Sequence, residues 1–397
     1  MQYQFADCLM DVERHEFFRG GNLIPVEPQV FDLLHLLVRN VGDLVTQDHL
    51  IQEVWQGRII SDSTIAARMN AARKAVGDSG KEQRIIKTVP RRGFQMIASV
   101  RKTQKTNDQS TPTQNAQERQ KVRFTTSADG TQIAYAMTGE GPPLMRAGHW
   151  LTHLELDWQS PVWRPTLDAI GAGHTLVRYD QRGTGLSDRD VTRLNVEAFA
   201  EDMKAVADAC GLEKFPIVAS SQGVPIAVHF AANNPERVSK MVFWGGYSQG
   251  WAKRDGGANA KVPDPFGLLI QNGWGEPQSA FMQAFTSLFF PGANREQIQQ
   301  MVAMQAASAS PELATRLREA LIAIDVTDLL AKVQAPTLVI HARNDSVHPL
   351  SQGKILASGI PNAEFMMTES SNHVALVQED CWKDLIDATM GFVDNQG

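Results

Sequence analysis

The feature that most limits how this 397-residue chain can fold is a polar segment at residues 101–121, RKTQKTNDQSTPTQNAQERQK. Ala116 is its one apolar residue, and Gln, Thr, Asn and Lys make up most of the rest. Such a segment cannot bury enough apolar surface to offset the entropy lost on ordering. We therefore expect a flexible linker here, between a domain at 1–100 and a larger domain at 122–397.

Composition narrows the class of protein. The net charge of −6 argues against a generic polyanion binder, although a local basic patch remains compatible with it. No apolar run reaches the ~18–20 residues needed to cross a bilayer, and the N-terminus lacks the apolar core of a signal peptide. Three scattered cysteines argue against a disulfide framework. We expect a reduced, cytoplasmic protein with no membrane partner.

The first hundred residues combine short strands with helices. Two strand-like runs come first, with a Gly20-Gly21-Asn22 turn in the second. Apolar residues then recur at helical spacing in three segments, within 28–42, 46–55 and 61–77. The predicted helix caps are Thr46 for the second helix and Ser61 or Asp62 for the third, which Gly77 ends.

A basic hairpin follows the third helix, with Pro90-Arg91-Arg92-Gly93 at its tip. Helices followed by such a hairpin make a winged helix-turn-helix, whose last helix can enter the major groove of double-stranded DNA. The alternative is a solvated helix face beside an ordinary hairpin. The candidate DNA contacts are the polar and basic residues of both elements: Thr64, Arg68, Asn70, Arg73 and Lys74 on the helix, and Arg91 and Arg92 on the hairpin.

Three motifs carry a family resemblance in residues 1–100. IPVEPQVFDLLHLLVRNVGDLVTQDHLIQEVW, SDSTIAARMNAARKAVGD and IIKTVPRRGFQM, in this order, resemble the OmpR/PhoB-type winged-helix domain, most of all in its ToxR- and CadC-like branch. The resemblance implies that the third helix reads DNA and that RNA polymerase is contacted. Ala71 and Ala72 stand where the family is often basic. These 397 residues contain no match to the receiver domain or the membrane span of relatives, so we expect the input signal to come from elsewhere in the chain.

In residues 122–397, apolar strands alternate with amphipathic helices after an opening hairpin with Asp129-Gly130 at its turn. This alternation predicts a mostly parallel, doubly wound α/β sheet covered on both faces.

A serine lies at one bend between strand and helix. The strand FPIVAS runs into Ser221-Gln222-Gly223 and then into the helix PIAVHF, so that Ala219-x-Ser221-x-Gly223 has small residues around the serine. A tight turn of this kind exposes a nucleophilic hydroxyl, and small flanking residues relieve its crowding. The alternative is an ordinary turn serine.

Partners for that serine follow in chain order. Asp345 ends the strand TLVIHARND, and His373 lies in ESSNHVAL before the last helix. In a serine hydrolase the aspartate orients the histidine, which acts as general base toward the serine. Alone, each is an ordinary loop residue, and their order and context favour a triad.

The whole of 122–397 resembles the α/β-hydrolase fold family, closest to domains carrying THLELDWQSPVWRPTL and VRYDQRGTGLSDR. The resemblance implies Ser221 as nucleophile, Asp345 as acid and His373 as base. It also implies the backbone N–H of Gln222 as one oxyanion donor and that of His149 or Trp150 as the other.

A helical cap is predicted at about 248–332, and its aromatic residues suggest a pocket for an apolar or aromatic small molecule. The alternative is that they only pack the cap on the sheet. The sequence predicts neither cofactor nor metal, since the pair His149 and His153 lacks a third ligand. The candidate pocket residues are Trp150, Trp244, Phe266, Trp274, Phe281 and Phe285.

Three functions fit these features, and the least favoured is a protein-interaction scaffold that neither prefers a DNA sequence nor binds a ligand. The first is a one-component transcription regulator, expected to be a homodimer, that binds DNA and senses a small molecule in the hydrolase-like domain. The second is an active serine hydrolase, of ester or lactone type, with an attached DNA-binding domain.

Overall fold

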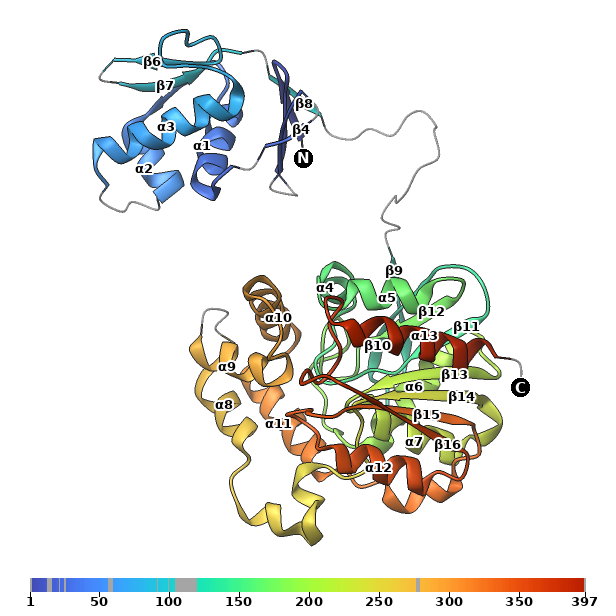
Figure 1. The fold of residues 1–397 in the computed structure, drawn as a ribbon. Helices are drawn as coiled ribbons and strands as arrows, with labels where there is room; N and C mark the ends of the chain where they lie inside the picture. The colour runs from blue at the N-terminus through green and yellow to red at the C-terminus, as the bar shows by residue number, and fades with distance from the viewer. Residues whose placement is uncertain are drawn as a thin grey trace. The chain divides into compact units, whose positions relative to one another are not determined.

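The computed structural model describes residues 2–12, 16–20, 22–24, 26–55, 60–90, 92–98, 100–103, 120–275 and 279–395. The chain divides into two compact units, Met1–Gln114 and Asn115–Gly397, shown in Figure 1 and treated separately below. Most of the predicted linker, 104–119, lies outside the described residues.

The described residues of the N-terminal unit form two small antiparallel sheets and three helices. One sheet has the strand order β4-β3-β2-β1-β8 and the other β5-β7-β6. The elements are β1 (Gln2–Phe5), β2 (Cys8–Asp11), β3 (Glu16–Arg19), β4 (Asn22–Leu23), α1 (Pro28–Arg39), β5 (Leu44–Thr46), α2 (Gln47–Trp55), α3 (Asp62–Val76), β6 (Ile86–Val89), β7 (Gly93–Met96) and β8 (Val100–Thr103).

Local sequence explains where the helices begin and end. The Thr46 hydroxyl accepts a hydrogen bond from the His49 N–H at 3.2 Å, and the Ser61 hydroxyl accepts one from Thr64 N at 3.3 Å. Gly77 ends α3 in the left-handed conformation, with φ of 71°. Ile65 and Met69 of α3 are buried in the core of this unit.

The last strand of this unit differs from the sequence-based expectation. β8 runs to Thr103, three residues into the segment expected to be linker, and pairs antiparallel with β1. The physical reason lies in the backbone, because β1 would otherwise leave its N–H and C=O groups unpaired along a sheet edge.

The C-terminal unit is built on one eight-stranded sheet in the order β16-β15-β14-β13-β11-β12-β10-β9. Strands β11 to β16 pair in parallel, and the antiparallel hairpin of β9 and β10 extends one edge. The strands are β9 (Lys121–Thr126), β10 (Gln132–Thr138), β11 (Pro143–Arg146), β12 (Thr175–Tyr179), β13 (Phe215–Ser220), β14 (Val238–Trp244), β15 (Thr337–Ala342) and β16 (Ala363–Thr368).

Helices cover both faces of this sheet. In Figure 1, α5 and α13 lie together on one face, while α6, α7 and α12 lie on the other. The helices outside the insertion described next are α4 (Leu154–Gln159), α5 (Arg164–Gly171), α6 (Val196–Ala209), α7 (Gly223–Asn233), η1 (Pro235–Arg237), α12 (Leu350–Gly359) and α13 (Asp380–Asp394).

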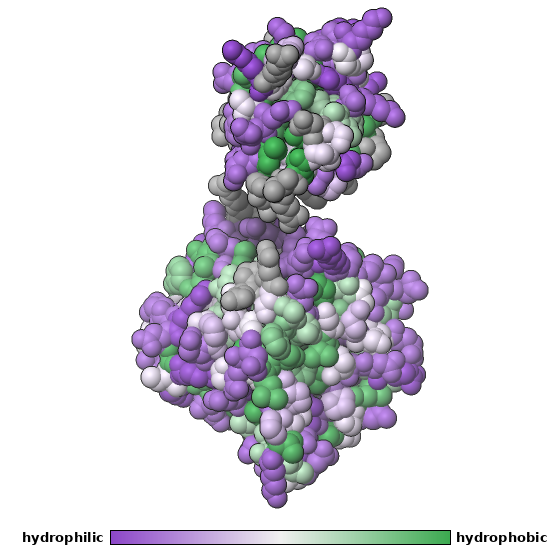
Figure 2. Space-filling view, turned by 90° about the vertical axis from the view of Figure 1, so that its left-hand side faces the viewer, coloured by the Kyte–Doolittle hydropathy of each residue, from purple (hydrophilic) through white to green (hydrophobic). Residues whose placement is uncertain are grey.

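A helical insertion, here called the cap, lies between β14 and β15 beside the carboxyl ends of the parallel strands. Figure 2 looks onto the side that carries α8 and α9, where apolar surface gathers over the middle of the unit. The cap comprises η2 (Trp251–Lys253), η3 (Asp255–Lys261), α8 (Pro265–Gly273), α9 (Ala280–Phe289), α10 (Arg295–Ser308), α11 (Pro311–Ala323) and η4 (Thr327–Lys332). In the described part of the chain, no helix is long and apolar enough to span a membrane.

Candidate active site and DNA-binding face

Ser221 lies at the sharp turn between β13 and α7, with a φ of 52° that is uncommon for a residue other than glycine. Its N–H donates to the Trp244 carbonyl at 3.0 Å, which fixes the turn against the neighbouring strand. Backbone crowding explains the small residue two positions later. A Cβ on Gly223 would lie 2.9 Å from the Gly148 carbonyl oxygen.

Asp345 and His373 meet beside this turn. The His373 Nδ1–H donates to Asp345 Oδ2 at 2.7 Å, and both residues are buried. Asp345 Oδ1 accepts hydrogen bonds from the backbone N–H groups of Val347 at 2.8 Å and His348 at 3.0 Å. Because Nδ1 carries the proton, the Nε2 of a neutral His373 has a free lone pair, as a general base requires.

Ser221 and His373 line the same small cavity of about 30 Å³. The Nε2 of His373 is buried and has no hydrogen-bond partner among the described residues, so it does not bond to the serine hydroxyl here. This contact is commonly long in hydrolases without bound substrate. The structure thus brings all three predicted triad residues to one place.

The predicted oxyanion donors lie at the same corner. Gln222 immediately precedes α7, so its N–H lies at the positive end of a helix dipole. The His149 Nδ1–H donates to the Trp150 carbonyl at 2.9 Å. Burial, followed by the nearby Arg146 charge, lowers the pKa of His149 well below its usual value, so the ring is neutral and its Nε2 carries no proton. The neutral imidazole of His149 thus offers no side-chain donor at Nε2, which leaves the backbone N–H groups of His149 and Trp150 as the predicted donors on this side.

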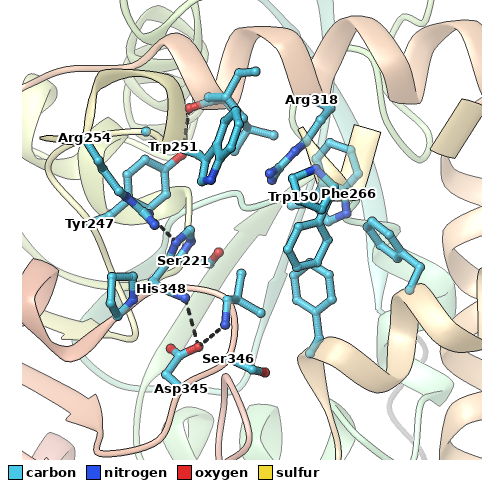
Figure 3. A pocket seen from close by; sticks show the side chains of 18 residues that line it. Trp150, Ser221, Tyr247, Trp251, Arg254, Phe266, Arg318, Asp345, Ser346 and His348 are labelled. Carbon is cyan, nitrogen blue, oxygen red and sulfur yellow. Dashed lines mark hydrogen bonds between the residues drawn. The ribbon is translucent and has the colours of Figure 1, made fainter. Parts of the chain in front are cut away.

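The cap encloses a larger cavity of about 280 Å³ that also reaches Ser221. Figure 3 shows Ser221 with Asp345 and His348 at one side and Trp150 with Phe266 at the other. Two cap arginines, Arg254 and Arg318, also line it.

The predicted pocket residues divide into two groups. Trp150, Phe266 and Phe285 line the larger cavity, whereas Trp244, Trp274 and Phe281 do not. The indole N–H of Trp244 donates to the Thr389 hydroxyl at 3.0 Å, and that of Trp274 to the Ala309 carbonyl at 2.9 Å. Both rings are buried by packing, while Phe281 is 47% exposed on the outer side of α9.

Sequence reasoning missed the polar lining of the larger cavity. Arg254 Nη2 donates to His348 Nδ1 at 2.8 Å, and the Tyr247 hydroxyl donates to the Leu321 carbonyl at 3.4 Å. Only His348 could have been found from the sequence as a polar lining residue, because it follows the predicted Asp345 by three residues in the same loop. The arginines come from the insertion, whose folding against the sheet the sequence pattern does not specify.

The loops that carry acid and base are both tied to the end of α9. His373 N donates to the Phe289 carbonyl at 2.8 Å, and the Ser346 hydroxyl donates to the Leu288 carbonyl. The cap therefore supports the candidate catalytic residues as well as covering them.

In the N-terminal unit, α3 carries most of the predicted DNA contacts. Asn70 and Lys74 are exposed on it, and Arg92 is exposed beside the hairpin turn. Thr64 is half-buried next to the Ser61 cap, and Arg68 is half-buried and pairs with Glu27 at 2.6 Å. Arg91 lies outside the described residues.

Arg73 requires a correction, because its side chain is only 6% exposed. Its guanidinium donates to the Ile86 carbonyl at 3.1 Å and to the Thr88 hydroxyl at 2.7 Å, both on β6. Arg73 thus fastens α3 to the hairpin instead of facing solvent.

Comparison with known families identifies the larger unit. The model of the alpha/beta hydrolase fold family matches residues 153–380, more than half of the chain. The chain belongs to the α/β-hydrolase fold family. A second model, described as the C-terminal domain of transcriptional regulatory proteins, matches residues 21–96. These matches confirm the predicted fold class, an OmpR/PhoB-type winged-helix domain followed by an α/β-hydrolase domain.

Curated relatives of the hydrolase domain are themselves hydrolases. The putative carbamate hydrolase RutD of Azorhizobium caulinodans is 27% identical over 66% of this chain and 96% of its own length. A 2-hydroxy-6-oxononadienedioate/2-hydroxy-6-oxononatrienedioate hydrolase of Pseudomonas putida is 29% identical over 64% of this chain and 85% of its own.

Solved structures agree on the fold. An esterase from Exiguobacterium antarcticum matches 68% of this chain and 99% of its own with a TM-score of 0.58 and 23% identity. An enol-lactonase from Burkholderia xenovorans LB400 matches 69% of this chain and 100% of its own with a TM-score of 0.56 and 18% identity.

The α/β-hydrolase domain offers no metal site among its described residues, nor does the described part of the winged helix. The two histidines considered for a metal have other roles. His149 donates to the Trp150 carbonyl, and His153 Nδ1 accepts from Leu156 N at the start of α4.

Buried charges lie beneath the oxyanion corner of the hydrolase domain. Arg146 and Asp157 are both nearly inaccessible, and burial raises the pKa of Asp157 to about 6 although Arg146 opposes the shift. The Arg146 guanidinium lies 4.9 Å from the centre of the Trp163 ring. A guanidinium so placed adds positive potential near His149 and favours negative charge there.

Proposed function

We propose that the protein is a one-component transcription regulator that binds double-stranded DNA through its winged helix and takes up a small molecule in its α/β-hydrolase domain. The observation that carries this proposal is the cavity of about 280 Å³ between the cap and Ser221, in a chain that also carries a DNA-binding domain. The ligand has an apolar or aromatic body, since aromatic rings line one part of the wall: Trp150, Trp251, Phe266, Phe285 and Phe289.

The DNA-binding face is proposed to centre on the exposed side of α3. Asn70 can read a base edge, while Lys74 and Arg92 supply positive charge for phosphates. Thr64 and Arg68 stand at the first half of the helix and complete this face. A homodimer is proposed as the binding form, because two copies would match paired half-sites on DNA, and RNA polymerase is a further proposed partner.

Titration of the full-length protein on the DNA upstream of its own gene tests this function. The expected result is saturable binding that prefers this DNA to a scrambled duplex, weakens with salt, and changes when metabolite extract is added. Equal affinity for both duplexes would refute the proposed role as a transcription regulator.

A serine hydrolase activity is the second candidate, favoured by the 2.7 Å contact of Asp345 with His373 beside the strained Ser221 turn. In the proposed reaction Ser221 Oγ attacks an ester or lactone carbonyl while His373 Nε2 takes its proton. The N–H groups of Gln222 and of His149 or Trp150 stabilise the oxyanion. His373 then protonates the leaving alcohol, and water hydrolyses the acyl-enzyme.

A fluorophosphonate probe tests this activity directly. Labelling of the wild type and its loss in Ser221→Ala are expected, together with a fall of more than about 10³-fold in hydrolysis of 4-nitrophenyl esters. A wild type that neither reacts with the probe nor hydrolyses these esters would limit the pocket to binding.

A further inference from the structure

The two arginines of the larger cavity differ in what neutralises them. Arg318 forms a two-point ion pair with Asp264, with Nη2 to Oδ1 at 2.8 Å, and so fastens α11 to the start of α8. Arg254 has no carboxylate within 4.0 Å among the residues that the structure describes. Among the described residues it therefore has no direct ion-pair partner, and Asp345 and Asp255 stabilise its charge only at longer range.

Arg254 is nevertheless held in a fixed position. Its Nε donates to the Gln249 carbonyl at 3.1 Å and its Nη2 to His348 Nδ1 at 2.8 Å, as Figure 3 shows for the second contact. A guanidinium has five N–H groups, so three have no acceptor in the described part of the chain. Two lie on Nη1 and one on Nη2, so both terminal nitrogens keep a donor for a ligand carboxylate.

In its contact with Arg254, His348 acts only as a hydrogen-bond acceptor. A guanidinium cannot accept a hydrogen bond, so His348 Nδ1 must be unprotonated. Burial, with the nearby His373 and Arg254, lowers the pKa of His348 well below its usual value, so the ring stays neutral. His348 therefore orients Arg254 without competing as a second cation for an acidic ligand.

The same residue connects Arg254 to the candidate triad. His348 N donates to Asp345 Oδ1 at 3.0 Å, and the ring centres of His348 and His373 are 5.1 Å apart. The unpaired positive charge thus belongs to the wall that carries the acid and base, and the aromatic wall of Trp150 and Phe266 bounds the same cavity.

We infer that Arg254 binds a carboxylate of the ligand, so that the molecule taken up is an acid with an apolar or aromatic body and an acyl group at Ser221. The inference rests on the proposed function, since it names the ligand class of that same cavity. Arg254 is a specificity residue in this assignment and takes no part in proton transfer. A half-buried cation without a carboxylate in direct contact gains an ion pair when an anion binds, which favours acids over neutral molecules of the same shape.

Two esters that differ only at one end test the inference on the full-length protein. Mono-4-nitrophenyl adipate carries a terminal carboxylate, and 4-nitrophenyl 6-methylheptanoate replaces it with an isopropyl group of similar shape. The wild type should prefer the adipate ester in kcat/KM. Arg254→Met should lose about 10- to 100-fold on that ester and change less than about threefold on the neutral one.

Matched variants separate charge from folding. Lys253→Met removes an exposed charge from the adjacent position and should keep the wild-type preference. Arg254→Lys should keep part of the preference, since it retains the charge but loses the two-point edge. Equal losses on both esters in Arg254→Met, or no loss on either, would overturn the inference while leaving the hydrolase proposal intact.

A binding measurement distinguishes failure of catalysis from failure of the inference. In the Ser221→Ala background, mono-4-nitrophenyl adipate should quench the fluorescence of the cavity residues Trp150 and Trp251. Arg254→Met should weaken this binding by about 10- to 100-fold even if the wild type hydrolyses neither ester. Equal affinity with and without Arg254 would overturn the inference on its own.

Discussion

At the scale of single residues, Ser221 has a strained backbone because its surroundings hold it there. A non-glycine residue at φ of 52° costs of order 1–3 kcal/mol, which other interactions must offset. The hydrogen bond from the Ser221 N–H to the Trp244 carbonyl provides part of that support, and glycine at 223 avoids a clash with the Gly148 carbonyl oxygen. Strain of this kind exposes the hydroxyl in the free protein, so the site is organised before a ligand binds.

Asp180 is a second residue in an unfavourable state. It is fully buried at the end of β12, where Oδ2 accepts from the N–H groups of Leu154 at 3.1 Å and Leu186 at 2.9 Å. Oδ1 has no partner among the described residues. Burial raises the pKa of Asp180 to about 7, against the opposing effect of the Leu186 hydrogen bond.

This pKa gives a stability prediction with a definite sign. Between the unfolded pKa of about 4 and the folded value, the native state holds a proton that the unfolded chain releases, so stability falls as pH rises. Asp180→Asn cannot ionise. We expect its free energy of unfolding to improve relative to wild type by about 1–3 kcal/mol between pH 5 and pH 8.

Urea unfolding followed by tryptophan fluorescence measures this difference, because seven of the eight tryptophans lie in the hydrolase domain and only Trp55 lies outside it. Taking the difference between the two proteins at each pH cancels the other titrating groups. A difference that is the same at both pH values would mean that Asp180 has an ordinary pKa.

At the scale of elements, α3 carries two kinds of residue: some hold the winged helix together, and others are exposed where DNA can bind. Arg73 donates inward to β6, whereas the next residue, Lys74, is exposed. Two neighbouring cations on one helix should therefore affect different properties.

Arg73→Met should lower the stability of the winged helix by about 1–3 kcal/mol, because the Ile86 carbonyl loses its side-chain donor. Lys74→Met should leave stability unchanged, weaken DNA binding, and reduce the slope of log affinity against log salt by about 0.9. Calorimetric melting and DNA titration at several salt concentrations measure the two effects. If Arg73→Met instead reduced the salt slope at unchanged melting temperature, α3 would face DNA differently.

The same helix shows what the sequence could and could not predict. Ile65, Met69 and Arg73 follow each other at intervals of four, so the spacing already placed Arg73 on the buried face, although its charge suggested a contact with DNA.

In the hydrolase domain, the Ser221 turn was predictable from the sequence because its strand, turn and helix are contiguous. Trp244 and Trp274 were assigned to the pocket wrongly, because their indole partners, Thr389 and Ala309, come from distant segments.

At the scale of the whole molecule, regulation requires that pocket occupancy favour one state of the protein over another. The end of α9 offers a place where that difference can begin. Its last carbonyls accept hydrogen bonds from the loops of Asp345 and His373, and Phe289 also lines the larger cavity. An occupant that displaces Phe289 therefore acts on the cap and on both loops together.

Covalent occupancy gives a test of coupling that needs no knowledge of the natural ligand. A fluorophosphonate that reacts with Ser221 releases fluoride and leaves a phosphonyl group in the cavity. We expect full labelling to change the Kd for the upstream DNA by about 5- to 150-fold, the usual range of coupling between sites. Ser221→Ala given the same reagent controls for effects elsewhere and should keep the Kd of the untreated protein. Complete labelling with an unchanged Kd and salt slope would mean that the two domains act independently. The protein would then be a hydrolase with an attached DNA-binding domain. A sensor must change its affinity for DNA when its pocket is occupied.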